Sequence, residues 1–235
     1  MKNSAFLVTG GAGNLGRSVT EIFLERGARV AVPFHKSDRP DALEPFKERF
    51  GDRLLEFGMD LTTDRGAGEA VKRVVEWAGR LDGVAHIMGG FRGGASLAET
   101  PVEEWDRMMS LNLRSSFLVA RAAIPALQGA GGGALVFVSS RAALAGRTGR
   151  GAYAVSKAAL ITLAETISEE YREEGIRANA ILPGVVDTED NRRAMPDADH
   201  ERWTAPEKIA RVVAFLVSEE SAVVNGAAVK TYGIS

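Results

Sequence analysis

Short apolar runs alternate along the chain with longer segments in which apolar residues recur every three or four positions. The runs have the length of β-strands and predict strands over Ala5–Thr9, Arg29–Phe34, Leu54–Met59, Gly83–Met88, Leu135–Ser139, Ile176–Leu182 and Ala227–Thr231. The periodic segments predict helices over Leu15–Arg26 and roughly over 41–50, 64–79, 101–128, 152–174 and 205–218. Strands that are apolar on both faces and separated by helices indicate a parallel sheet covered on both sides.

The alternation continues from one end of the chain to the other. Right-handed crossovers between parallel strands give a doubly wound α/β sheet of the Rossmann type. The glycine-rich stretch at 129–133 has a helix before it and a strand after it, so it is interpreted as a loop and not as a linker. We therefore expect a single domain over residues 1–235.

The composition excludes several classes of function. The 29 basic and 31 acidic residues give a net charge of −2, so no general basic surface for nucleic acid is expected. The absence of cysteine excludes thiolate chemistry and disulfides, and three histidines far apart in the sequence argue against a metal site. No apolar stretch approaches the about 18 residues of a membrane span, and none has the core of a signal peptide. We expect a soluble, cytoplasmic protein with no membrane partner.

A glycine-rich turn, TGGAGNLG at residues 9–16, follows the first expected strand and opens the first helix. Such a turn directs backbone N–H groups and the positive end of a helix at a phosphate, and its glycines let the phosphate approach closely. The turn predicts a dinucleotide site, although a tight turn without a ligand has the same sequence. The candidate cofactor residues here are Gly10, Gly13, Asn14, Leu15 and Gly16.

Tyr153 and Lys157 lie four residues apart, on one face of an expected helix. A tyrosine phenol has a pKa of about 10, and a neighbouring ammonium lowers it, as proton transfer near neutral pH requires. Such a pair is more often a plain helix contact. Two further residues favour a catalytic site: Ser140, at the carboxyl end of a strand where open parallel sheets bind ligands, and Asn112.

Together these motifs resemble those of the short-chain dehydrogenase/reductase family. The turn is similar to the family's Thr-Gly-x-x-x-Gly-x-Gly, with Gly10 and Gly16 in register and Asn14 in place of the middle glycine. The other matching segments, in the family's order, are Asp60-Leu61, Gly89, Asn112-Leu113, Ser139-Ser140, Tyr153-x-x-x-Lys157 and Pro183-Gly184-x-x-x-Thr188. The strand end HIMG at 86–89 departs from the family's Asn-Asn-Ala-Gly except at its glycine.

The resemblance implies an NAD(P)-dependent oxidoreductase acting on a small carbonyl or alcohol. It implies that Tyr153 transfers the proton, Ser140 binds the substrate oxygen and Lys157 tunes Tyr153 and holds the nicotinamide ribose. Asn112 would anchor a water in the proton path. The cofactor contacts that it implies beyond the turn are Asp60, Leu61, Gly89, Tyr153, Lys157, Pro183, Gly184, Val186 and Thr188. No metal is implied.

The end of the second strand bears on the choice between NADP and NAD. An acidic residue about twenty positions past the glycine turn binds the ribose 2′-hydroxyl of NAD, and it would repel a 2′-phosphate. Phe34 occupies that position here, and the residues that follow it are His35, Lys36 and Ser37, which offer cations and a hydroxyl. This favours NADP, with NAD as the alternative.

Three further expectations follow from the resemblance. Residues 187–206 are expected to form a substrate lid. The helices at 101–128 and 152–174 are expected to build a homo-oligomer, either a tetramer or a dimer. GGFRGG at 89–94 and several lid residues are similar to those of dihydropteridine reductases, but that subgroup lacks a serine at the position of Ser140 and prefers NADH. Pterin reduction is therefore an alternative, and a non-catalytic nucleotide sensor is another.

Overall fold

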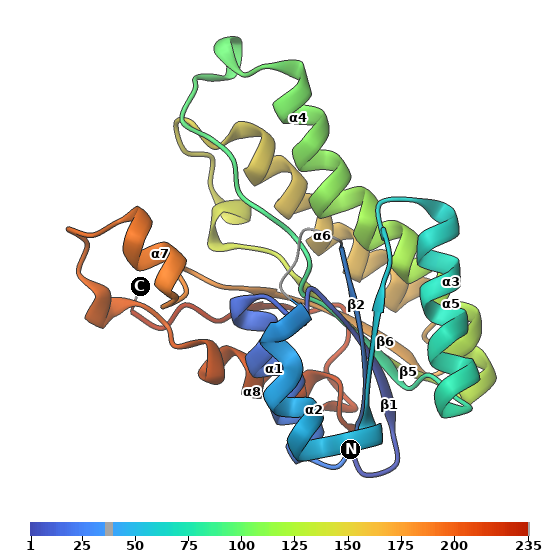
Figure 1. Ribbon diagram of the computed structural model, residues 1–235. Coiled ribbons are helices and arrows are strands. Elements are labelled where there is room, and N and C mark those ends of the chain that lie inside the picture. Colours follow the sequence, from blue (N-terminus) through green and yellow to red (C-terminus); the bar gives the residue numbers. More distant parts are fainter. Residues whose placement is uncertain (36–39, 235) are drawn as a thin grey trace.

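Seven parallel strands form one sheet in the order β3-β2-β1-β4-β5-β6-β7 (Figure 1). The computed structural model describes residues 1–35 and 40–234. The strands are β1 (Ala5–Thr9), β2 (Arg29–Phe34), β3 (Leu54–Gly58), β4 (Gly83–His86), β5 (Gly133–Val138), β6 (Ile176–Leu182) and β7 (Ala228–Lys230). The doubly wound parallel sheet predicted from the alternation is confirmed.

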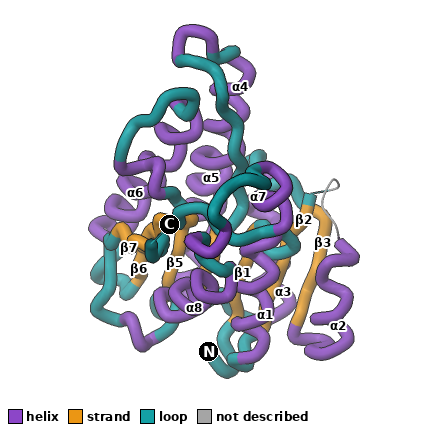
Figure 2. The backbone as a smooth tube through the Cα atoms, turned by 90° about the vertical axis from the view of Figure 1, so that its left-hand side faces the viewer, coloured by secondary structure: helices purple, strands orange, loops and turns teal. Residues whose placement is uncertain are grey.

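Helices cover both sides of the sheet (Figure 2). They are α1 (Asn14–Glu25), α2 (Glu44–Phe50), α3 (Asp64–Ala78), α4 (Val102–Met108), α5 (Ser115–Ala130), α6 (Gly151–Glu170), α7 (Glu189–Ala194) and α8 (Pro206–Leu216). Of these, α4 and α7 project beyond the sheet (Figures 1 and 2). One buried core joins the sheet to α3, α5 and α6, and the other joins it to α1, α2 and α8. Both cores draw on β1: Leu7 faces the first, and Phe6 and Val8 face the second. This is why the strands are apolar at successive positions.

Two helical segments differ from the expectation. The single helix expected over 101–128 is divided into α4 and α5 by a π-helical turn at Met109–Arg114. The short helix α7 within the expected lid was not predicted. Its N-terminus is capped by Thr188, whose hydroxyl accepts a hydrogen bond from the Asn191 N–H at 3.2 Å.

The strand order places the predicted site segments at one edge of the sheet. β1 lies between β2 and β4. The chain therefore leaves the carboxyl ends of β1 and β4 toward opposite faces of the sheet, and a crevice opens between these two strand ends. The glycine turn follows β1, Gly89 follows β4, Ser140 follows β5 and Pro183 follows β6. Of the helices in the described ranges, none has both the length and the apolar character needed to cross a membrane.

Candidate active site

The glycine turn packs so tightly that two of its positions accept only glycine. Gly10 has a φ of +67°, and a Cβ atom there would lie 2.9 Å from the Met88 nitrogen. A Cβ atom on Gly16 would collide with the Gly10 carbonyl oxygen. The turn is closed by a hydrogen bond from the Gly13 N–H to the Gly10 carbonyl, 3.0 Å long. The close packing leaves the start of α1 open toward the crevice.

A groove of about 650 Å³ runs from this turn along the carboxyl ends of the strands. This volume lies within the range of small-molecule and cofactor sites. The predicted cofactor residues that line it are Gly10, Gly13, Asn14, Leu15, Gly16, His35, Asp60, Leu61 and Gly89. Arg107 and Leu111, from α4 and the π-helical turn, also line it and were not predicted. No motif in the sequence indicates that this helical segment reaches the groove.

Asp60 presents an ionised carboxylate at this groove. Its Oδ1 accepts hydrogen bonds from the N–H and the hydroxyl of Thr62, at 2.9 and 2.6 Å. These bonds are the main reason why the pKa of Asp60 lies below its usual value, and nearby His35 lowers it further. The predicted residues Lys36 and Ser37 lie outside the described residues.

Ser140 and Tyr153 come together at the end of β5. The Ser140 hydroxyl lies close enough to the phenol to lower the pKa of Tyr153, as does the charge of Arg150. Burial of the phenol outweighs both, so the pKa of Tyr153 is raised overall. The expectation that Lys157 pulls this pKa down is therefore wrong for the structure as it stands. The reason is that desolvation of the phenol is the largest influence on it.

Lys157 is buried beneath Tyr153, with its ammonium 5.9 Å from the centre of the tyrosine ring. The ammonium donates a hydrogen bond to the carbonyl of Val138 at the end of β5, 2.8 Å away. Burial lowers the pKa of Lys157 to about 8. Ser139 has a structural contact instead, because its hydroxyl donates to the Lys157 carbonyl at 2.7 Å and so joins β5 to α6.

Asn112 is fully buried in the π-helical turn and holds the loop after β4. Its Oδ1 accepts from the Gly90 N–H at 2.9 Å, and its Nδ2 donates to the Gly90 carbonyl at 3.1 Å and to Ser156 at 3.0 Å. A Cβ atom on Gly89 would lie 2.8 Å from the Asn112 oxygen and 2.9 Å from the Lys157 ammonium. Asn112, Lys157 and the backbone of Gly89 thus form one contact region. π-Helical turns often occur at functional sites.

The remaining predicted cofactor residues follow β6 and do not line the groove. They are Pro183, Gly184, Val186 and Thr188. The Pro183 carbonyl accepts a hydrogen bond from the Arg141 N–H, and Val186 pairs with Thr204 across the lid. The lid also reaches the glycine turn, because the Asn14 amide donates to Asp190 at 2.8 Å. This bond connects residues 176 positions apart, and the sequence motifs gave no sign of it.

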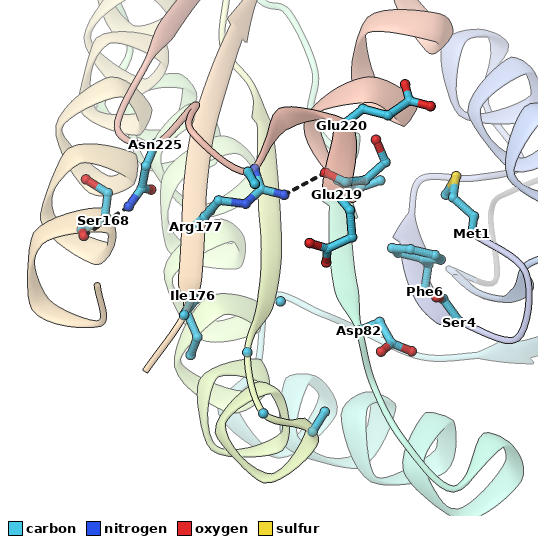
Figure 3. Close-up of a pocket in the computed structure, with 18 of the residues that line it drawn as sticks. Met1, Ser4, Phe6, Asp82, Ser168, Ile176, Arg177, Glu219, Glu220 and Asn225 are labelled. Atoms are coloured by element: carbon cyan, nitrogen blue, oxygen red, sulfur yellow. Dashed lines mark hydrogen bonds between the residues drawn. The ribbon is translucent and has the colours of Figure 1, made fainter. Parts of the chain in front are cut away.

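Another hollow, of about 790 Å³, lies at the opposite edge of the sheet (Figure 3). Arg177 at the start of β6 points into it and donates hydrogen bonds to the carbonyls of Leu216, Ser218 and Val224. Parallel sheets bind their ligands at the carboxyl ends of the strands, whereas this hollow is at the amino ends. Its polar groups tie the C-terminal segment to β6, and we place the active site at the other edge.

Comparisons with known proteins agree with this geometry. The family model described as Enoyl-(Acyl carrier protein) reductase matches residues 10–232. An uncharacterized oxidoreductase of Thermotoga maritima is 31% identical over 97% of this chain and 95% of its own. A 2-(R)-hydroxypropyl-CoM dehydrogenase of Xanthobacter autotrophicus is also 31% identical, over 94% of both chains. A 3-oxoacyl-[acyl-carrier-protein] reductase of Thermotoga maritima is 29% identical over 96% of this chain and 95% of its own.

Solved structures share the whole architecture. A short-chain type dehydrogenase/reductase from Mycobacterium ulcerans superimposes with a TM-score of 0.91 over 99% of this chain and 90% of its own, at 26% identity. ElxO, solved with NADP bound, superimposes with a TM-score of 0.90 over 98% of this chain and 97% of its own. At 22% identity this second likeness concerns the fold alone.

Proposed function

The chain belongs to the short-chain dehydrogenase/reductase family, and we propose that it performs hydride transfer at a site built by Ser140, Tyr153 and Lys157, with NADP as its preferred cofactor. The family model and the named relatives are oxidoreductases. The chain is accordingly an NAD(P)-dependent enzyme that moves a hydride between nicotinamide and a small carbonyl or alcohol. Neither the family nor these relatives favour the nucleotide-sensor alternative.

The groove fits a nicotinamide dinucleotide. Gly10 and Gly16 leave no side chain between the groove and the start of α1, so backbone N–H groups are open to a diphosphate. Asp60 supplies a fixed carboxylate acceptor farther along the groove. Beyond the groove, Lys157 lies within reach of the Gly89 backbone, where the nicotinamide ribose would be held. When bound, the nicotinamide gives or takes the hydride.

The proximity of the Ser140 hydroxyl to the Tyr153 phenol is the observation that carries the proposed chemistry. Both hydroxyls can contact one substrate oxygen, with Ser140 orienting it and Tyr153 exchanging a proton with it. Burial raises the pKa of Tyr153, so the phenol is protonated at neutral pH and can donate to a carbonyl oxygen. Asn112 holds the Gly90 backbone beside this site and would retain a water near Lys157.

Replacement of Tyr153 by phenylalanine tests this proposal. Tyr153→Phe removes only the hydroxyl, so we expect turnover to fall by about a hundred- to ten-thousand-fold while the dissociation constant for the cofactor stays close to that of the parent. Turnover comes from steady-state assays on a panel of ketones, aldehydes and alcohols, and cofactor binding comes from fluorescence titration. A Tyr153→Phe variant that turns over at the parental rate would refute the assignment.

The preference for NADP is supported by the end of β2. Phe34 stands at the position where a carboxylate would bind the 2′-hydroxyl of NAD, and His35 lines the groove next to it. We expect a higher kcat/KM for NADPH than for NADH. His35→Ala and Lys36→Ala should each lower only the value for NADPH. Equal or NADH-favouring values in the parent would overturn the preference.

Quinonoid pterin reduction is the second candidate, favoured by the ring of Phe91 in the loop after β4. This ring lies edge-on to Tyr153, with 5.0 Å between the ring centres, and offers an apolar wall to a planar substrate. The contact of Ser140 with Tyr153 favours the carbonyl reaction instead, because the pterin enzymes lack that serine. A Ser140→Ala variant with parental turnover, alongside an inactive Tyr153→Phe, would favour the pterin reaction.

A second copy of the chain is the proposed partner of the face made by α4, the π-helical turn, α5 and α6. Its apolar residues Met109, Leu113, Phe117 and Leu163 surround a shallow hollow of about 730 Å³. Phe117 is 47% exposed there. Exposed apolar surface of this kind is typical of subunit interfaces. It supports the expected homo-oligomer, a dimer or a tetramer.

A further inference from the structure

The loop after β4 is fastened to the segment that leads into α6. The Gly94 N–H donates to the Gly149 carbonyl at 2.8 Å, and a Cβ atom on Gly93 would collide with that same carbonyl oxygen. Gly94 and Gly149 have φ values of +127° and +71°, which favour glycine. The two backbones can approach this closely only because these residues lack side chains. The contact fixes the position of Phe91 on one segment and of Arg150 on the other.

Phe91 and Arg150 therefore stand beside Tyr153. The Phe91 ring meets the Tyr153 ring edge-on at 86°, with 5.0 Å between centres. The Arg150 guanidinium carbon lies 5.6 Å from the centre of the Phe91 ring. Arg150 is also close enough to Tyr153 for its charge to lower the pKa of the phenol. Phe91 remains 55% exposed, so this wall is open to a molecule bound over Tyr153.

No carboxylate of the described residues neutralises Arg150. None of the ion pairs found within 1–35 and 40–234 includes it, and its side chain is exposed. Two acids of the lid have cations of their own: Asp187 pairs with Arg192 and Asp190 with Arg193, each at 2.6 Å. The stretch 107–164, which carries the proposed chemistry, contains seven basic residues and no acidic one.

We propose that Arg150 binds an anionic oxygen group, a carboxylate or an equivalent sulfonate or phosphate, carried by the substrate a short distance from its reacting carbonyl. This inference rests on the proposed function and names the substrate class of the same site. A guanidinium binds such groups through two parallel N–H bonds. Phe91 holds the guanidinium from one side and packs against the apolar part of the substrate. Arg150 is then a specificity residue, whereas Ser140 and Tyr153 act on the carbonyl.

Two pairs of probes that differ in charge test the proposal. They are acetoacetate with methyl acetoacetate, and 4-formylbenzoate with methyl 4-formylbenzoate. With NADPH, we expect the parent to favour the acid of each pair in kcat/KM, mainly through a lower KM. In Arg150→Gln this ratio should fall by about ten- to hundredfold, the usual effect of losing a charge-assisted hydrogen bond, and Arg150→Lys should recover part of it.

Arg147→Gln is the matched control, because Arg147 is an exposed arginine three residues away that is assigned no role. It should keep the parental ratio. Calorimetric titration of the same probes into the complex with oxidised NADP gives the ratio of dissociation constants, so a probe that is turned over slowly still reports on binding. A parent without preference for the acids, or an Arg150→Gln variant with the parental ratio, would overturn the subsite. If the subsite fails this test but the esters are still turned over by a reaction that depends on Tyr153, the proposed function is retained.

Discussion

His86, at the end of β4, should make the stability of the protein depend on pH between 5 and 7.5. Its side chain is 1% exposed and lies between the end of β1 and the start of α5. Nδ1 is 3.0 Å from the Thr9 hydroxyl, and Nε2 is 3.3 Å from the Ser115 hydroxyl. The short-chain dehydrogenase/reductase family has an asparagine at this position of the strand end, so His86→Asn is a suitable replacement that does not titrate.

The hydrogen bonds around His86 require a neutral ring. The Ser115 hydroxyl donates to the Leu111 carbonyl at 2.7 Å, so it must accept from His86, and Nε2 carries the proton. Nδ1 is then the acceptor of the Thr9 hydroxyl, whose oxygen in turn accepts from the Met88 N–H. A second ring proton would force the Thr9 hydroxyl to turn its own hydrogen away from Nδ1, and it would place a positive charge in a buried site.

Burial, and the charge of Lys157, lower the pKa of His86 to about 3 from 6.5. The unfolded chain therefore binds one more proton than the folded chain between these two pH values, and the contribution of His86 to stability is lost as the pH falls through them. At pH 5, about 1.5 units below the unfolded pKa of 6.5, protonation of His86 stabilises the unfolded state by about 2 kcal/mol. That figure holds for any folded pKa well below 5, so it depends only on the ring staying neutral.

Urea unfolding at pH 7.5 and pH 5.0 measures this effect, with the protomer concentration held constant because association also changes stability. The parent should lose about 2 kcal/mol more than His86→Asn over this interval. His200→Gln, which removes a histidine from the lid, is the control and should follow the parent. Parallel losses in the parent and in His86→Asn would refute the reasoning, whatever the absolute stability of the variant.

Three other outcomes are expected. Asn112→Ala leaves both backbone groups of Gly90 without their partner, so the free energy of unfolding in urea should fall by about 2–3 kcal/mol; a change below about 0.5 kcal/mol would contradict this. Burial lowers the pKa of Lys157 to about 8, so between about pH 8 and 10.5 the unfolded chain binds more protons than the folded chain. The free energy of unfolding of the parent should therefore rise by about 2 kcal/mol relative to that of Lys157→Met between pH 7 and 9.5. Urea unfolding at both pH values measures this, and a constant difference between the two proteins would argue against the burial of the charge. Phe117→Asp places a charge in the proposed subunit interface, so light scattering should give the mass of an oligomer for the parent and a smaller mass for the variant; a monomeric parent at micromolar concentration would exclude the oligomer.

The sheet could be predicted from the sequence because its five inner strands are buried on both faces. β1, β2 and β6 begin and end at the expected residues. The break between α4 and α5 could not be predicted, because the apolar spacing continues through the π-helical turn. The turn places Asn112 against Gly90, a contact between segments 22 residues apart. α7 has only six residues and no apolar face, so periodicity gave no signal for it.

The same distinction applies to the site. Gly10 and Gly16 were predictable because both belong to one continuous turn motif, in which Gly16 packs on the Gly10 carbonyl and Gly10 packs on the Met88 backbone. The wall made by Phe91 and Arg150 was not, since it depends on contacts between glycines about 55 positions apart in the chain. Each of these glycines alone looks like part of an ordinary loop. Only the fold shows that the two loops meet beside Tyr153.

The pKa of Tyr153 shows why spacing alone does not determine chemistry. Four residues of helix bring Lys157 beneath the tyrosine, but the ammonium is itself buried and directed at the Val138 carbonyl. Burial therefore lowers the pKa of Lys157. Burial raises the pKa of Tyr153 by more than Ser140 and Arg150 together lower it. The phenol consequently stays protonated at neutral pH. A protonated Tyr153 can give a proton to a carbonyl oxygen but cannot take one from an alcohol, so in this state the site is suited to reduction.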